Sequence, residues 1–233
     1  MHYKELLKGV NAYASDDKNS ENAFPIILHD EEKIRERSYL ELVAYGRPTE
    51  KLVEDIRYFL REWNRRVPVD VEKLKEAIEQ VPDYVKKWDI EKMDLWEYHE
   101  EITKIFQTFI NTGKNRNNYT GASKTLHIFN PRFFAMWDSY IRDGYGCCEN
   151  EEGYFNFLLR CQKEIEEIIL TYDCDFPAGP EISQRIYYGH SKSIVKLLDE
   201  YNIAKYTNKW LTPNEEKDTT SIVREMREKS YDI

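Results

Sequence analysis

The chain has 233 residues, of which 41% are hydrophobic, 14% aromatic and 33% charged, and its formal net charge is −9. This composition is too apolar and too aromatic for a disordered chain, and the length suits one large domain or two small lobes. The acidic balance argues against a generic nucleic-acid binder, because neutralisation of phosphates dominates that kind of affinity.

No segment of the sequence has the pattern of a membrane span or a secretion signal. The longest apolar runs, such as residues 24–28, contain only a few residues, which excludes a transmembrane helix. The first 18 residues lack the apolar stretch of a signal peptide. We therefore expect a cytoplasmic protein with no membrane partner.

The cysteines do not form a metal-binding pattern. They are Cys147, Cys148, Cys161 and Cys174, and no pair has the CxxC spacing of a zinc ribbon or an iron–sulfur loop. The five histidines are scattered, so spacing assembles no metal site and we expect no cofactor. We predict four reduced structural thiols, with Cys161 in the core.

The first half of the chain is predicted to be helical after a polar segment of low order at 15–22. Apolar residues recur at helical spacing in 31–45 and again in 49–66. Asp70 is placed to cap a third helix, which ends at Val81 before a proline.

The clearest predicted helix runs from Asp94 to Thr112. Asp94 is followed three residues later by Glu97, a variant of the capping box with Asp in place of Ser or Thr. A broad apolar stripe follows, and Gly113 supplies the C-terminal stop.

The second half continues the helical pattern beyond residue 146. Helices are predicted at 153–172 and 181–201, separated by a Pro/Gly-rich linker at 176–180, with a short weak helix at about 219–229. No alternating strand pattern and no internal repeat occurs in the sequence. The predicted fold is therefore all-α.

The whole chain, 1–233, is expected to form a single globular unit. It can be divided into two helical lobes, one of about 1–93 plus the C-terminal helices and the other of about 94–175. The second lobe would hold the segment 119–146, where the candidate functional residues gather.

Segment 119–146 contains a predicted turn, a short helix, a break and a second helix start. The turn is Gly121-Ala122-Ser123, and Lys124 and His127 lie near the start of the helix. Asn130-Pro131 should end that helix, because the residue before proline is pushed out of the α region. Asp138 then stands where the N-cap of the next helix belongs.

Asp138 and Lys124 are the candidate catalytic residues. A carboxylate held at a helix N-terminus beside Trp137 and Tyr140 can stabilise positive charge on a sugar or activate an attacking amine. An amine desolvated among apolar neighbours can lose its proton and attack carbon. The simpler alternatives stay open: Asp138 only caps its helix, and Lys124 is a solvated helix lysine.

The same segment offers candidate contacts to a phosphate backbone. Gly121 and Ser123 could present backbone N–H groups to a phosphate, as helix N-termini do. His127 is a further candidate contact, and the simpler alternative is a histidine whose hydrogen bonds are already satisfied within its helix. Residues 111–146 carry five Lys or Arg against two Asp, so a local basic face lies on an acidic chain.

The order of Gly121, Lys124-Thr125 and then Trp137-Asp-Ser-Tyr-Ile-Arg142 resembles the helix-hairpin-helix DNA base-excision glycosylases, over about forty residues. The resemblance implies a two-lobed helical fold in which Lys124 attacks the anomeric carbon and Asp138 supports expulsion of the base. When Gly121 is aligned with the first hairpin glycine of the family, Thr125 takes the nucleophile position instead.

The resemblance also implies a set of substrate contacts. The target base would be flipped into an aromatic-lined pocket, while backbone amides hold the DNA phosphates. The candidate binding residues are Tyr119, Gly121, Ser123, His127, Trp137, Tyr140 and Arg142.

Two functions follow from the sequence. The first is a DNA glycosylase acting in repair, a hydrolase that excises a modified base from damaged double-stranded DNA bound through the local basic face. The alternative is a catalytically inactive all-α module on the same scaffold, which binds nucleic acid or another protein.

Overall fold

A computed structural model describes residues 1–14, 50, 52–54, 56–57, 60, 68–114, 117–177 and 193–211. The helices predicted at 31–45 and 219–229 lie outside these residues. The described residues of the helix predicted at 49–66 are all helical.

The described residues fold into helices joined by short loops. In chain order the elements are α1 (Tyr3–Ala14), α5 (Val71–Gln80), η2 (Asp83–Lys87), η3 (Leu95–Tyr98), α6 (His99–Ile110), α7 (Tyr119–Phe129), α8 (Ser139–Gly144), α9 (Glu151–Asp175), α11 (Ile194–Asn202) and the π-helical turn η4 (Ile203–Thr207). Within the described ranges the extended pairing is limited to an isolated bridge between Val69 and Gly113. The prediction of an all-α fold is confirmed for this part of the chain.

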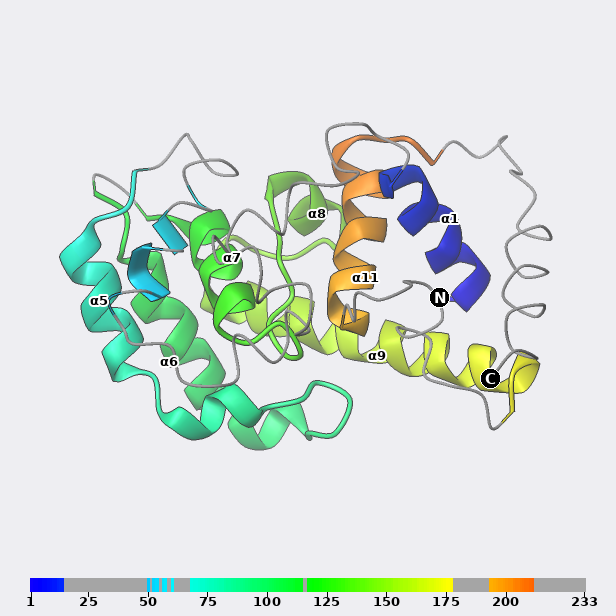
Figure 1. The fold of residues 1–233 in the computed structure, drawn as a ribbon, viewed down its shortest axis with the longest axis horizontal. Coiled ribbons are helices and arrows are strands. Elements are labelled where there is room, and N and C mark those ends of the chain that lie inside the picture. The colour runs from blue at the N-terminus through cyan, green and yellow to red at the C-terminus, as the bar shows by residue number, and fades with distance from the viewer. Residues whose placement is uncertain are drawn as a thin grey trace, which may run out of the picture.

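Helix α9 is the long axis around which the others are arranged. It runs along one side of the molecule, with α5 and α6 towards one end and α1 and α11 at the other (Figure 1). Helices α7 and α8 lie between these two groups. In the part of the chain that the structure describes, no helix is long and apolar enough to span a membrane.

The middle of the core is built from aromatic rings. The rings of Phe106 and Tyr154 are stacked with centroids 3.8 Å apart, and Trp137 meets Tyr154 edge-on at 5.2 Å. Phe157 lies 5.6 Å from Trp137. These residues come from α6, α9 and the segment before α8, so the cluster fixes those three elements together.

Helix α1 was not predicted, although its pattern is visible in the sequence. Tyr3, Leu6, Leu7, Val10 and Tyr13 recur at helical spacing, and all five are buried. The helix packs mainly against α11. Because α1 covers a face of α11 that would otherwise meet water, every residue of α11 is buried.

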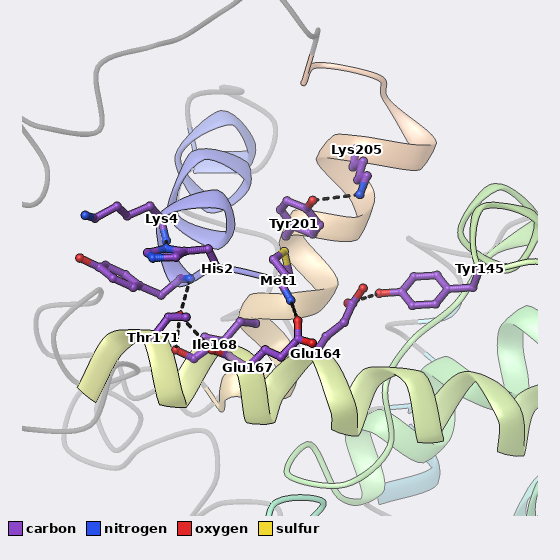
Figure 2. A network of polar contacts seen from close by, with 11 residues as sticks. Met1, His2, Lys4, Tyr145, Glu164, Glu167, Ile168, Thr171, Tyr201 and Lys205 are labelled. Atoms are coloured by element: carbon purple, nitrogen blue, oxygen red, sulfur yellow. Dashed lines mark hydrogen bonds and ion pairs between the residues drawn. The ribbon is translucent and has the colours of Figure 1, made fainter. Parts of the chain in front are cut away.

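A polar network joins α1 to α9 (Figure 2). The terminal amine of Met1 pairs with Glu167, and the Tyr3 amide N–H donates to Thr171 Oγ1 at 3.0 Å. One turn earlier on α9, Glu164 Oε2 lies 2.6 Å from the hydroxyl of Tyr145, and burial raises the pKa of the Glu164 carboxyl. The network therefore links the first residues of the chain to the loop that follows α8.

Several predicted helix limits differ from those of the structure. Asp94 does cap a helix, but that helix is the 3₁₀ turn η3, and the α-helix begins at His99. Helix α9 is longer than predicted, because Asn150 caps it and the helix continues to Asp175. Of the helix predicted at 181–201, residues 181–192 lie outside the described residues; the described part is α11, which Ser193 caps in an extended conformation. Asp70 caps α5 as predicted.

Gly153 allows the start of α9 to approach the preceding loop. A Cβ atom on this residue would lie 1.8 Å from the carbonyl oxygen of Cys148, which is backbone and cannot swing aside. We predict that Gly153→Ala lowers the free energy of unfolding by about 3 kcal/mol. Glu166→Ala, an exposed change on the same helix, should stay within about 0.5 kcal/mol of the parent in urea titrations.

If Gly153→Ala is as stable as the parent, the loop that contains Cys148 does not pack against the start of α9 as closely as described above.

Candidate functional site

Helix α7 begins earlier than the sequence suggested, which changes the role of Gly121. The predicted Gly-Ala-Ser turn is wrong, because residues 121–123 lie inside α7. The cap is Asn118, whose Oδ1 accepts from the Gly121 N–H at 3.0 Å. A Cβ atom on Gly121 would overlap the Asn118 side chain, so glycine here makes room for the cap.

The early start of α7 also alters the candidate phosphate contacts. Gly121 is buried, and its amide is already bonded to Asn118. Ser123 is fully buried within the helix. In this arrangement neither residue offers a backbone N–H to a phosphate.

Ser123 and His127 instead hold the segment 134–137, which we call the connector. The Trp137 N–H donates to Ser123 Oγ at 3.1 Å, and Ser123 Oγ also lies 3.1 Å from the Trp137 carbonyl oxygen. His127 Nδ1 lies 2.7 Å from the Phe134 carbonyl oxygen, and a carbonyl only accepts, so Nδ1 carries the proton. Two residues one helical turn apart therefore fix the two ends of the connector.

Helix α9 holds the middle of the connector. The Tyr154 hydroxyl donates to the Ala135 carbonyl oxygen at 2.8 Å. At the end of α7, the Asn130 side-chain amide donates to the carbonyl oxygens of Val85 and Trp88 at 2.8 and 2.9 Å. With each bond worth about 1 kcal/mol, these contacts fix the path of the chain from α7 to Asp138.

Asp138 caps α8 as the sequence predicted. Its Oδ1 accepts from the Ile141 N–H at 2.9 Å. Its Oδ2 accepts from the hydroxyl of Thr207 in η4 at 2.8 Å. The carboxylate is thus oriented by two elements that are 69 residues apart in the sequence.

Lys124 lies on α7 and is half-buried. Burial lowers the pKa of its amine, and the negative charges of Asp199 and then Asp138 oppose this effect. The structure therefore brings Lys124 within electrostatic reach of Asp138, and it adds a second carboxylate that the sequence did not single out.

The second carboxylate belongs to a buried group of charges on α11. Lys196 Nζ lies 2.6 Å from Asp199 Oδ2 and 3.8 Å from Glu200 Oε1, and all three side chains are almost wholly buried. The Lys196 ammonium also lies 5.4 Å from the centre of the Tyr13 ring on α1. Although burial alone would lower the pKa of Lys196, these partners together raise it.

The remaining predicted contact residues differ widely in exposure. Trp137 is 2% exposed and belongs to the aromatic core. Tyr140, in contrast, is 57% exposed on α8. Tyr119 is half-buried, and its hydroxyl accepts from Asn117 at 3.2 Å.

The predicted basic face is partly neutralised by neighbouring carboxylates. Arg142 pairs with Glu149 and, at 3.1 Å, with Asp143. Arg132 lies 3.9 Å from Asp89. Both arginines therefore meet a phosphate only in competition with these acidic side chains.

Thr207, Lys196 and Asp199 are the residues near the site that the sequence did not reveal. Lys196 and Asp199 are three residues apart on a helix that is otherwise rich in apolar residues. This spacing is the sequence feature that could have indicated a buried ion pair. It could not be interpreted without α1, because an amphipathic helix normally exposes such residues.

The cysteines are all free, and Cys161 is buried as predicted. Burial raises the pKa of the Cys161 thiol well above its ordinary value. Among the described residues, no group of three or more His, Cys, Asp or Glu side chains is arranged to hold a metal ion.

No protein-family model, curated protein or solved structure matches this chain.

His127 gives the connector a pH-dependent anchor. Burial and the nearby Lys196 charge lower the pKa of His127 from about 6.5 to about 3. Between pH 6.5 and about pH 3, His127 therefore binds a proton in the unfolded chain but not in the folded chain. The parent should therefore lose up to about 5 kcal/mol of stability through His127 as the pH falls from 6.5 to 3.

His127→Asn tests this assignment, because the asparagine amide nitrogen can replace Nδ1 as donor to Phe134. We expect urea titrations at a series of pH values to give a shallower loss of stability on acidification for the variant than for the parent. Equal slopes for the two proteins would contradict a neutral buried His127.

Proposed function

We propose that this protein is a DNA glycosylase with a fold like that of the helix-hairpin-helix superfamily. Lys124 is the nucleophile that attacks the anomeric carbon of a damaged nucleotide, and Asp138 is the carboxylate that stabilises charge on the sugar. The substrate is a modified base in double-stranded DNA.

The observation that carries the proposal is a half-buried amine on which the charge of an oriented carboxylate acts. Burial lowers the pKa of Lys124, so more of the amine is neutral at a given pH than for a solvated lysine. Asp138 is held at the N-terminus of α8 by Ile141 and Thr207. A solvated Lys124 would have favoured the alternative hypothesis, a catalytically inactive binding module.

The reaction follows from these two groups. The neutral amine of Lys124 donates its electron pair to the anomeric carbon, and the bond from that carbon to the base breaks. The base leaves with the electron pair of the broken bond and takes up a proton. Positive charge that develops on the sugar ring lies near Asp138, whose carboxylate stabilises it. The nitrogen then passes a proton to the ring oxygen, the bond between the anomeric carbon and that oxygen breaks with its electron pair on the oxygen, and the carbon–nitrogen bond becomes a protonated Schiff base.

A Schiff base can be trapped by reduction, which gives the first test. The parent protein, incubated with a panel of damaged duplexes and borohydride, should form a covalent adduct with at least one lesion. Lys124→Gln should abolish that adduct, because glutamine has no nucleophilic amine. Lys163→Gln, an exposed change on α9 with the same loss of charge, should leave the adduct yield unchanged.

An adduct that persists in Lys124→Gln would exclude Lys124 as the nucleophile. The same trapping assay should then be run on a Thr125 variant, because the alternative alignment places Thr125 in the nucleophile position.

Base release provides a second and separate test, which also detects an enzyme that uses water instead of Lys124. We expect Asp138→Asn to reduce base release at least about 100-fold, since it removes the charge opposite the sugar. Asparagine is itself a good helix cap, so α8 should be retained. Thermal unfolding of the variant close to that of the parent would confirm this.

Base release at the parent rate in Asp138→Asn would limit Asp138 to its capping role.

One observation favours the alternative of an inactive binding module. Both oxygens of Asp138 already accept hydrogen bonds, and the Gly121 amide is bonded to Asn118. A protein of this kind would bind duplex DNA or a protein partner without releasing any base. Absence of both adduct and base release over the whole lesion panel would favour this module over the enzyme.

A further inference from the structure

Both ends of helix α8 are tied to one unit of the fold, which consists of α11 and the turn η4 that follows it. At the start of α8, Asp138 Oδ2 accepts from the hydroxyl of Thr207, the last residue of η4, at 2.8 Å. At the end of α8, the hydroxyl of Tyr145 lies 3.1 Å from Oδ1 of Asn202, the last residue of α11. The two contacts span 69 and 57 residues of the chain, so only the folded structure makes them.

Close packing holds η4 against α8 between these two contacts. A Cβ atom on Gly144 would lie 2.3 Å from Cδ1 of the Tyr206 ring, so glycine lets η4 approach the end of α8. The centroid of the Tyr206 ring also lies 5.6 Å from that of Tyr145. Because Thr207 follows Tyr206 directly, the same approach places the threonine hydroxyl within reach of Asp138.

The shape of η4 suits an element that must aim one side chain. The Asn208 N–H donates to the Ile203 carbonyl oxygen at 2.9 Å, which is the i to i+5 spacing of a π-turn. Single π-turns are uncommon, and they occur frequently at functional sites. Here the turn follows α11 directly and ends at Thr207, whose hydroxyl it delivers to the cap of α8.

We propose that Thr207 is the positioning residue of Asp138: its hydroxyl holds Oδ2 and fixes the direction in which the carboxylate faces the sugar. The Ile141 N–H holds only Oδ1, and a carboxylate held at one oxygen can still turn about its bond to the chain. With both oxygens held, the carboxylate keeps one orientation. This inference rests on the proposed function of Asp138, and Thr207 acts through Asp138 and not on the DNA.

Hydrogen exchange measures this role without DNA. The Ile141 N–H is bonded to Asp138 Oδ1, so its exchange rate in native-state NMR experiments reports how well the carboxylate is held. We expect Thr207→Val, which keeps the shape and removes the hydroxyl, to speed the exchange of Ile141 about 10-fold. The amide of Phe157, in the buried part of α9, should exchange at the parent rate. Thr207→Ser keeps the hydroxyl and should restore the slow exchange of Ile141.

Thr108→Val is the matched control, because it removes the same kind of hydroxyl from another helix. The Thr108 hydroxyl donates to the Lys104 carbonyl oxygen within α6, at 2.9 Å. This change should leave the exchange of Ile141 unaltered. If Thr207→Val does not fold, Thr207→Ala removes the same hydroxyl with a smaller side chain and should give the same acceleration.

Three exchange results would overturn the proposal. In the first, the Ile141 amide of Thr207→Val exchanges at the parent rate. In the second, Ile141 and Phe157 exchange faster by the same factor, which indicates a general loss of stability. In the third, Thr207→Ser behaves like Thr207→Val.

Base release then shows whether this orientation matters for the reaction. At saturating DNA, Thr207→Val should lower the rate of base release about 10-fold and leave KM unchanged, because the loss of an interaction made only in the transition state lowers kcat. Thr207→Ser should recover most of the rate. A higher KM with base release at the parent rate would overturn the proposal.

The exchange and base-release results separate this proposal from the proposed function. A parent protein that releases no base but shows the effect of Thr207 on Ile141 would refute the glycosylase and keep the hydrogen bond that positions Asp138. If base release is lost in Asp138→Asn but keeps the parent rate in Thr207→Val, the glycosylase stands and the role of Thr207 is refuted.

Discussion

The connector between α7 and α8 is the part of the structure on which the site depends. Its two ends are held by Ser123 and His127, and its middle is held by Tyr154 from α9. These bonds satisfy backbone groups that would otherwise be buried without partners. Because the connector also carries Trp137 into the aromatic core, the position of Asp138 is set by packing and hydrogen bonding together.

The second feature is the concentration of charge inside a helical core. Lys196, Asp199 and Glu200 lie on a helix whose residues are all buried, and the charge of Lys124 on α7 acts on Asp199. A buried ion pair contributes little net stability, since desolvation offsets much of the attraction. In the proposed glycosylase, these groups and the lysine of lowered pKa belong to one site. The proposed glycosylase uses this arrangement to supply an amine and a carboxylate to one sugar.

Local features of the site could be predicted from the sequence, and contacts across the fold could not. Pro131 after Asn130 marks the end of α7, and Asp138 before a helical run marks the start of α8; both predictions are confirmed because each depends on neighbouring residues. Gly121 was misread because the capping residue is the asparagine three positions before it. Asp199 was missed because its burial depends on α1, nearly 200 residues away in the chain. The predicted division into two lobes stays a prediction.

The titration of Lys124 in the unmodified sequence tests the account most directly. Reductive methylation with ¹³C-labelled formaldehyde places an NMR probe on each lysine, and the spectrum of Lys124→Arg identifies the signal of Lys124. The account predicts that this signal titrates below dimethyllysine in a short unfolded peptide, because the amine is withdrawn from water. A Lys124 signal that titrates at or above that of the peptide would contradict a desolvated amine and the mechanism built on it.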